Sequence, residues 1–183
     1  TWLKVPKTIQ IMLNGRLKDG VYAKDAILYI IGQAGADGAN YKAVEFCGES
    51  IENMSMSERM TICNLSAEMG AKAGMVPFDE TTQKWLKERV RAPYYPLQAD
   101  DDAVYERVLQ YDLSNLEPQV ACPHKVDNVR PVKDLPKVKI DVVLLGTCTN
   151  GRLDDLKIAS ELLNGKRIAP GVRLLVYPAS RQV

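Results

Sequence analysis

Apolar residues recur at every second position near the amino end of the chain, at Ile9, Ile11 and Leu13. A period of two is typical of a strand with one buried face. The spacing then becomes helical, with Ala26 and Ile30 four positions apart. The pattern of the first 110 residues predicts, in order, a strand over 8–13, a helix over 24–31, a strand over 42–47, helices over 58–69 and 80–90, and a weaker helix over 103–110.

Two of these helices begin at residues that suit an amino end. Ser57 is the expected N-cap of the helix over 58–69, and Gly70 is expected to stop that helix. Asp79 is the expected N-cap of the next helix, because a carboxylate there accepts hydrogen bonds from free backbone N–H groups.

A change of composition marks the middle of the chain, where residues 113–136 are richer in proline and polar side chains. We expect a long connection there with local extended pieces. This predicts one α/β domain over residues 1–115, followed by residues 116–183 as the connection and the start of a second α/β domain. The expected parallel βαβ unit with a right-handed crossover consists of a strand over 140–145, a helix over 154–163 and a strand over 173–177.

Composition narrows the class of protein. The chain has 183 residues, 46% hydrophobic and 26% charged, with a formal net charge of +1. A balanced charge offers no electrostatic basis for binding nucleic acid, and no apolar run approaches the ~20 residues that span a bilayer. The four cysteines lie far apart, so we expect reduced thiols and a cytoplasmic protein.

The segment after the strand over 140–145 carries the strongest candidate chemistry. Cys148 lies on a tight turn before a helix, where backbone N–H groups favour a thiolate that can bind a metal or attack an electrophile. The alternative is a small buried hydrophobic residue. Asn150 and Arg152 follow within the same loop. An arginine suits recognition of a carboxylate, whereas the alternative is a surface charge that opens the next helix.

A second candidate pair lies on the helix over 58–69. Asn64 and Glu68 are four positions apart, so a continuous helix would place both on one face. Because their neighbours are small and apolar, an amide and a carboxylate there indicate a binding site. The alternative is a solvated face with a local hydrogen bond.

Several motifs together resemble the aconitase superfamily over essentially the whole chain. Gly146-Thr147-Cys148-Thr149-Asn150-Gly151-Arg152 is similar to the first cluster-cysteine motif of that family. The other matching stretches are Glu45-Phe46-Cys47-Gly48, Ser55-Met56-Ser57-Glu58-Arg59-Met60-Thr61-Ile62-Cys63-Asn64 and Ala67-Glu68-Met69-Gly70-Ala71.

The resemblance implies three-layer α/β/α domains with parallel-rich sheets and a [4Fe–4S] cluster. Cys148 would be a metal ligand of that cluster. Asn64 and Glu68 would be catalytic residues beside it, while Asn150 and Arg152 would bind substrate. The implied reaction is a hydro-lyase isomerisation of a hydroxy di- or tricarboxylic acid. Within the family, the resemblance is greatest to large subunits that interconvert 2-isopropylmalate and 3-isopropylmalate in leucine biosynthesis.

The resemblance leaves further expectations and alternatives. A separate small subunit would supply the general base and a specificity loop. The downstream CxxC motif and the upstream Asp-His segment of the family are absent, so we expect an internal portion that is inactive alone and lacks the cluster. Cys63 and Cys148 are a hypothetical disulfide when iron is missing. The alternatives are a homoaconitate-forming large subunit and a non-catalytic structural or RNA-binding domain.

Overall fold

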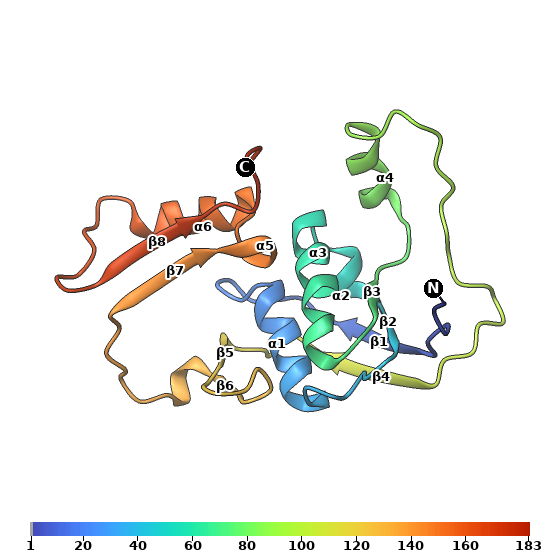
Figure 1. Cartoon of the computed structure of the whole chain (residues 1–183), viewed down its shortest axis with the longest axis horizontal. Helices are drawn as coiled ribbons and strands as arrows, with labels where there is room; N and C mark the ends of the chain where they lie inside the picture. Colours follow the sequence, from blue (N-terminus) through green and yellow to red (C-terminus); the bar gives the residue numbers. More distant parts are fainter. Residues whose placement is uncertain (1) are drawn as a thin grey trace. The chain divides into compact units, whose positions relative to one another are not determined.

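The computed structural model describes residues 2–183, and the chain divides into two compact units, Thr1–Asp134 and Leu135–Val183 (Figure 1). The first unit contains β1 (Thr8–Asn14), α1 (Ala23–Ala34), β2 (Ala43–Cys47), α2 (Glu49–Glu52), α3 (Met56–Leu65), the 3₁₀ turn η1 (Ser66–Met69), β3 (Ala73–Met75), α4 (Glu80–Lys87), β4 (Arg107–Asp112), β5 (Gln119–Ala121), β6 (Val129–Pro131) and the 3₁₀ turn η2 (Val132–Asp134). The second contains β7 (Val142–Gly146), α5 (Thr147–Asn150), α6 (Leu153–Leu163) and β8 (Arg173–Tyr177).

The core of the first unit is a parallel sheet with strand order β3-β2-β1-β4. The alternation predicted for β1 is confirmed, because Ile9, Ile11 and Leu13 are all buried. Val44 and Phe46 of β2 are buried on the same side. Full burial of each such side chain contributes about 1.5–3 kcal/mol, so this face of the sheet is a main source of stability.

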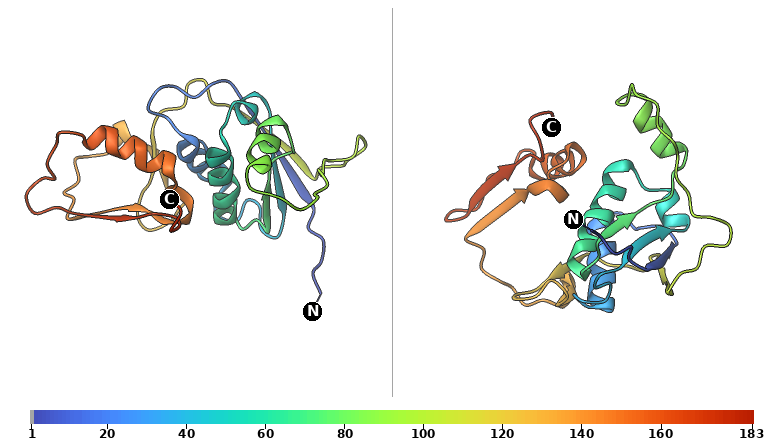
Figure 2. Two further views of the ribbon diagram at one scale, coloured as in Figure 1. Left: turned by 90° about the horizontal axis from the view of Figure 1, so that it is seen from above. Right: turned by 45° about the vertical axis from the view of Figure 1, so that its right-hand side comes forward.

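Helices α1 and α3 cover that apolar face, and both views of Figure 2 show them side by side against the sheet. The apolar residues predicted for α1 pack inward. Those of α1 with no more than 1% exposure are Ala23, Ala26, Ile27, Ile30 and Ile31.

The amino end of α3 differs from the prediction. Ser55, not Ser57, is the N-cap: its Oγ accepts a hydrogen bond from the Glu58 N–H at 3.3 Å, and the Glu58 carboxylate accepts one from the Ser55 N–H at 2.8 Å. This reciprocal capping box requires Glu or Gln three residues after the cap, a condition that Ser55 meets. The carboxyl end also differs, because α3 ends at Leu65; Gly70, with a left-handed φ of 81°, ends the 3₁₀ turn η1 that follows.

The predicted helix over 103–110 is wrong. Residues Arg107–Asp112 form strand β4, which pairs in parallel with β1 at the sheet edge. Leu109 and Tyr111 pack against the core while their neighbours face outward, which is the period of a strand. Pairing with a distant strand therefore overrides the weak local helical preference.

The segment expected to be a connection contains the antiparallel hairpin of β5 and β6. This hairpin packs against α1. The Asp25 carboxylate of α1 also accepts a hydrogen bond from the Gln119 N–H at 2.7 Å. Residues 116–134 are thereby part of the first compact unit, which ends at Asp134, later than the boundary expected after residue 115.

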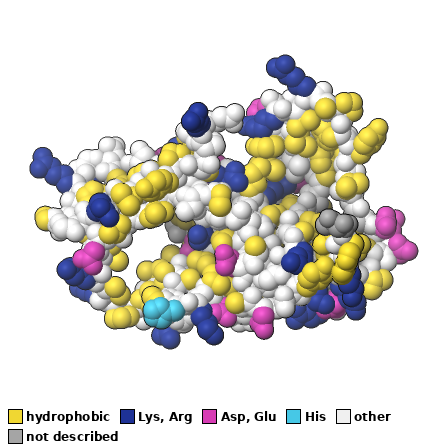
Figure 3. All heavy atoms as spheres, in the orientation of Figure 1, with side chains coloured by type: hydrophobic (Ala, Val, Ile, Leu, Met, Phe, Trp, Pro, Cys, Tyr) yellow, Lys and Arg dark blue, Asp and Glu magenta, His cyan; other side chains and the backbone are white. Residues whose placement is uncertain are grey.

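The second unit confirms the predicted βαβ order. Strands β7 and β8 pair in parallel, with Gly146 opposite Tyr177, and α6 lies between them in sequence. Parallel sheets are normally covered on both faces, yet this one leaves apolar side chains at the surface (Figure 3). Those at least 40% exposed on the two strands are Val142, Val143, Leu144, Val176 and Tyr177. None of the helices within residues 2–183 is long and apolar enough to cross a membrane.

Candidate functional site

Cys148 lies on the short helix α5, directly after the carboxyl end of β7. Gly146 precedes this helix with a φ of 146°, and a Cβ there would collide with the Tyr177 carbonyl oxygen of β8. Thr147 has a φ of 80°, a conformation that is strained for a threonine. The chain therefore turns within two residues, and only glycine fits at the first of them.

The thiol of Cys148 is exposed. Its Sγ is 4.0 Å from the Thr149 Oγ1, and Thr149 itself is buried. The interpretation of Cys148 as a small buried hydrophobic residue does not fit this exposure. An exposed thiol on a loop held by its neighbours suits a ligand or a nucleophile.

Asn150 and Arg152 are fixed by one carboxylate, that of Asp155 in the first turn of α6. Asp155 Oδ1 accepts a hydrogen bond from Asn150 Nδ2 at 3.0 Å, and its Oδ2 accepts one from the Arg152 N–H at 3.0 Å. The Asn150 Oδ1 and Arg152 Nε atoms are buried without a hydrogen-bond partner among the described residues. Such atoms are rare in native structures, and an absent ligand is one explanation.

Asn64 and Glu68 do not lie on one continuous helix. α3 ends at Leu65, and Glu68 belongs to the 3₁₀ turn η1 that follows. The chain tightens here because Ser66 donates from its Oγ to the Cys63 carbonyl at 2.7 Å, before Gly70 reverses its direction. Both predicted residues are exposed, so they are open to a ligand.

Glu68 lines a cavity of about 530 Å³ within the first unit. Lys24 of α1 contributes a cation to the same wall, and among residues 2–183 no ion pair joins it to Glu68. Asn64 is not one of the lining residues. The remaining lining is mostly apolar and consists of Leu28, Leu65, Gln119, Val120, Ala121 and Val126.

This cavity was not predicted from the sequence. Its wall combines α1, the end of α3, η1 and the β5–β6 hairpin, which are far apart along the chain. Glu68 lies near the amino edge of the sheet, since the adjacent Met69 carbonyl accepts a hydrogen bond at 2.9 Å from Ala39, which precedes β2. Lys24 carries no sequence signal beyond its place in the first turn of a helix.

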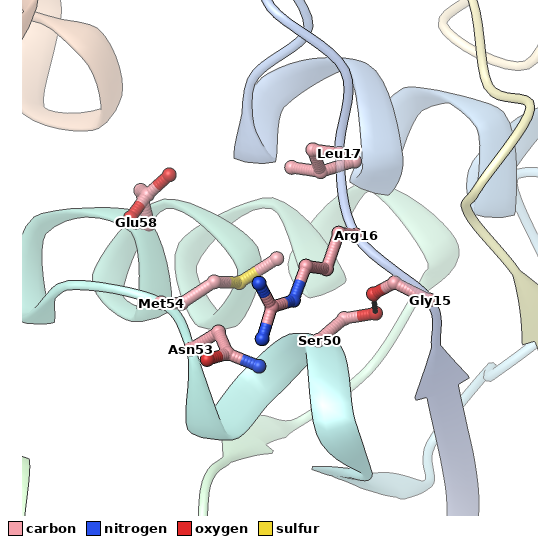
Figure 4. Close-up of a pocket in the computed structure, with 7 residues that line it drawn as sticks. All are labelled: Gly15, Arg16, Leu17, Ser50, Asn53, Met54 and Glu58. Carbon is pink, nitrogen blue, oxygen red and sulfur yellow. Dashed lines mark hydrogen bonds between the residues drawn. The ribbon is translucent and has the colours of Figure 1, made fainter.

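A second cavity, of about 270 Å³, lies at the carboxyl ends of β1 and β2 (Figure 4). Ser50 donates a hydrogen bond to the Gly15 carbonyl at 2.6 Å and holds its rim. The Arg16 side chain projects over this cavity, where it is 3.8 Å from Glu49 and shares the wall with Glu58. Opposite charges thus balance at this site, which favours no particular ligand.

The other cysteines differ from Cys148 in their surroundings. Burial raises the pKa of Cys63 to about 11, so its thiol is protonated at neutral pH. Burial, with the nearby Glu45 and Glu52 carboxylates, also raises the pKa of Cys47. No group of three or more His, Cys, Asp or Glu side chains within residues 2–183 is arranged to hold a metal ion.

The fold is a parallel α/β architecture with an exposed thiol at a strand end, and comparison with known proteins assigns its class. The chain belongs to the aconitase family (aconitate hydratase), whose profile matches residues 1–139 and 130–183. The resemblance and the α/β fold class inferred from the sequence are thereby confirmed.

Three similar proteins are named as large subunits. The chain is 50% identical to the 3-isopropylmalate dehydratase large subunit of Halothermothrix orenii, over 100% of this chain and 44% of the relative. It is 54% identical to 3-isopropylmalate dehydratase large subunit 1 of Thermotoga maritima, over 100% of this chain and 44% of the relative. It is 51% identical to the probable methanogen homoaconitase large subunit of Methanosarcina mazei, over 98% of this chain and 46% of the relative. The chain therefore spans about half the length of these relatives.

Proposed function

We propose that this chain is part of the large subunit of a [4Fe–4S]-dependent hydro-lyase that interconverts 2-isopropylmalate and 3-isopropylmalate. The observation that carries the proposal is the exposed Cys148 thiol at the carboxyl end of β7. The names of relatives at about 50% identity support the substrate, because most of them are 3-isopropylmalate dehydratase large subunits.

The donor set fits one corner of an iron–sulfur cluster. Cys148 offers an exposed thiol, and the buried Asn150 Oδ1 and Arg152 Nε atoms nearby lack protein partners among the described residues. The remaining ligands would come from outside these residues. When bound, such a cluster supplies a Lewis-acidic iron that polarises a substrate hydroxyl and carboxylate.

The side chains of this chain would bind and orient the substrate around that chemistry. From the family resemblance, Glu68 and Asn64 would hold a hydroxyl or water, and the Glu68 carboxylate would exchange its proton. Arg152 and Asn150 would recognise a carboxylate. The cavity at Glu68 supports a branched hydroxy acid, since it offers the cation Lys24 for a carboxylate and apolar walls for a short alkyl group.

We further propose a hetero-oligomer, because the relatives are named as large subunits. The small subunit would supply the general base and a loop that selects the substrate. Homoaconitate is the second candidate substrate, favoured by the 51% identity to the probable homoaconitase large subunit. A complete large subunit, mixed with its small subunit and given each substrate separately, would distinguish the two by their kcat/KM values.

The test is Cys148→Ser in the complete large subunit, with Cys122→Ser as the matched control. We expect iron content and the visible absorption of the cluster to fall in the first variant and to be unchanged in the second. Unchanged iron in Cys148→Ser would overturn the proposal and favour a structural or RNA-binding role, which an RNA titration at two salt concentrations would then examine.

Glu68→Gln, with the exposed Glu88→Gln as its control, tests the catalytic assignment. The first change should lower kcat by about 100-fold or more while the iron content stays the same, because it removes a proton-exchanging group but no ligand. Equal kcat values for the two variants would contradict the role of Glu68.

A further inference from the structure

One carboxylate, that of Asp155 in α6, binds both Asn150 and Arg152 of the loop that follows Cys148. Its two oxygens are used separately, one by the Asn150 side chain and one by the Arg152 backbone, each at 3.0 Å. Asp155 is half-buried, whereas Asp154, its neighbour in the same helical turn, is exposed. Within residues 2–183 the Asp154 carboxylate forms no hydrogen bond or ion pair.

The bridge determines which atoms of Asn150 remain available. Because Nδ2 donates to Asp155, the amide orientation is fixed and Oδ1 points away from the carboxylate, where it is buried and unpartnered. An amide that could rotate would instead present either atom to a ligand. Asp155 thus leaves the Asn150 Oδ1 acceptor, and not the Nδ2 donor, available to a ligand.

The opposite side of the loop is held by backbone packing. The Gly151 carbonyl accepts a hydrogen bond from the Ala179 N–H at 2.8 Å, and a Cβ at Gly151 would crowd the Thr147 and Tyr177 carbonyl oxygens. Thr147, with its positive φ, needs such surroundings to hold it. On the α6 side, the Asp155 carboxylate anchors the loop through Asn150 and Arg152.

We propose that Asp155 is a positioning residue for the loop over residues 147–152: it holds the Asn150 side chain and the Arg152 backbone so that Cys148, Asn150 and Arg152 face one ligand. This inference rests on the proposed function for the identity of that ligand. Asp155 acts through its two partners and has no contact with the reacting atoms in this assignment.

The first test needs no cluster and uses hydrogen exchange in the 183-residue chain. Asp155→Asn should increase the exchange rate of the backbone amides around Arg152 by roughly tenfold, since one carboxylate acceptor is replaced by an amide that cannot satisfy both donors. Asp154→Asn removes the same charge from the same helical turn, so it should leave the rate unchanged. Equal rates in the two variants would overturn the proposal.

The second test follows the cluster in the complete subunit. Asp155→Asn should lower the iron retained after reconstitution and speed its loss in air, while Asp154→Asn and the distant helix-cap variant Ser55→Ala retain iron as the parent does. Adding Asn150→Ala to Asp155→Asn should cause less further loss than Asn150→Ala causes alone, because both act on one bridge.

The outcomes separate the two proposals. If the parent subunit binds no cluster, the proposed function fails, and the exchange measurement still decides the role of Asp155. If the parent binds a cluster and Asp155→Asn retains it equally well, the positioning role fails and the proposed function stands. Iron loss in Ser55→Ala as well would show an effect of general stability and would also overturn the positioning role.

Discussion

Arg59 is the largest fully buried side chain of the first unit, with 2% of its surface exposed. Its guanidinium donates two hydrogen bonds to Asp79, at 2.7 and 2.6 Å, and further bonds to the Met54 and Glu52 carbonyls. A buried cation of this kind is stable only when every donor is satisfied. One side chain therefore joins α3, the turn before it and the N-cap of α4.

Asp79→Asn should lower the free energy of unfolding by about 2–4 kcal/mol, less than for a fully buried pair because Asp79 is partly exposed. The Arg59 guanidinium lowers the pKa of Asp79 to about 2 from a usual value of 3.8. Because the folded-state pKa is depressed, this stabilisation is present above pH 4 and is lost as the pH falls toward 2. Urea unfolding at several pH values measures it, and a variant whose stability follows the same acid dependence as the parent would contradict the assignment.

The cysteines should differ in reactivity within one chain. Cys148 is exposed, whereas burial raises the pKa of Cys63 to about 11. Alkylation at pH 8 should modify Cys148 first, and the Cys63 rate should rise roughly tenfold per pH unit as its thiolate fraction grows. Because its raised pKa keeps the thiol protonated, Cys63 is also a poor partner for the hypothetical disulfide with Cys148. Equal free-thiol counts with and without reductant would agree with this expectation, and two fewer free thiols without reductant would contradict it.

At the scale of elements, the capping of α3 gives a matched pair of variants. Ser55→Ala should cost about 1 kcal/mol, because the Glu58 N–H loses its acceptor. Ser57→Ala should be close to neutral, since Ser57 lies within the first turn of α3 and is not its N-cap. Thermal unfolding of both variants checks this, and a larger loss of stability for Ser57→Ala than for Ser55→Ala would contradict Ser55 as the N-cap.

Local pattern was enough for some elements and not for others. β1, α1 and the βαβ unit were predicted because their apolar spacing is long and regular. β4 was missed because its evidence is the pairing with β1, which no local window contains. The N-cap of α3 was misplaced because two serines, Ser55 and Ser57, lie at the start of the helix and only Glu58 decides between them.

The candidate site was likewise predictable only where its residues are close together in the sequence. Cys148, Asn150 and Arg152 lie within five residues, so the sequence alone brings them together. Asn64 and Glu68 required a continuous helix, and the helix ends at Leu65. The cavity at Glu68 was beyond prediction, because Lys24 and Val120 meet there only through tertiary packing.

At the scale of the whole molecule, Cys148 is the exposed cysteine among the described residues, and the chain matches about half the length of its relatives. We expect the 183-residue chain alone to give no turnover of 3-isopropylmalate, and the complete large subunit with its small subunit to give turnover. Ultraviolet absorbance of the unsaturated acid formed by dehydration measures this. Turnover by the chain alone would refute the cluster-based assignment.

The strand order of the first unit also governs how the chain acquires its fold. β1 pairs with β4, nearly a hundred residues later in the sequence, in the register Ile9 to Arg107. During synthesis β1, α1, β2 and α3 are made before β4 and can assemble. One edge of β1 then remains unpaired until β4 has been synthesised. An open apolar edge recruits other chains. Nascent chains that stop before residue 107 should therefore aggregate or need a chaperone, and chains that include residue 112 should not.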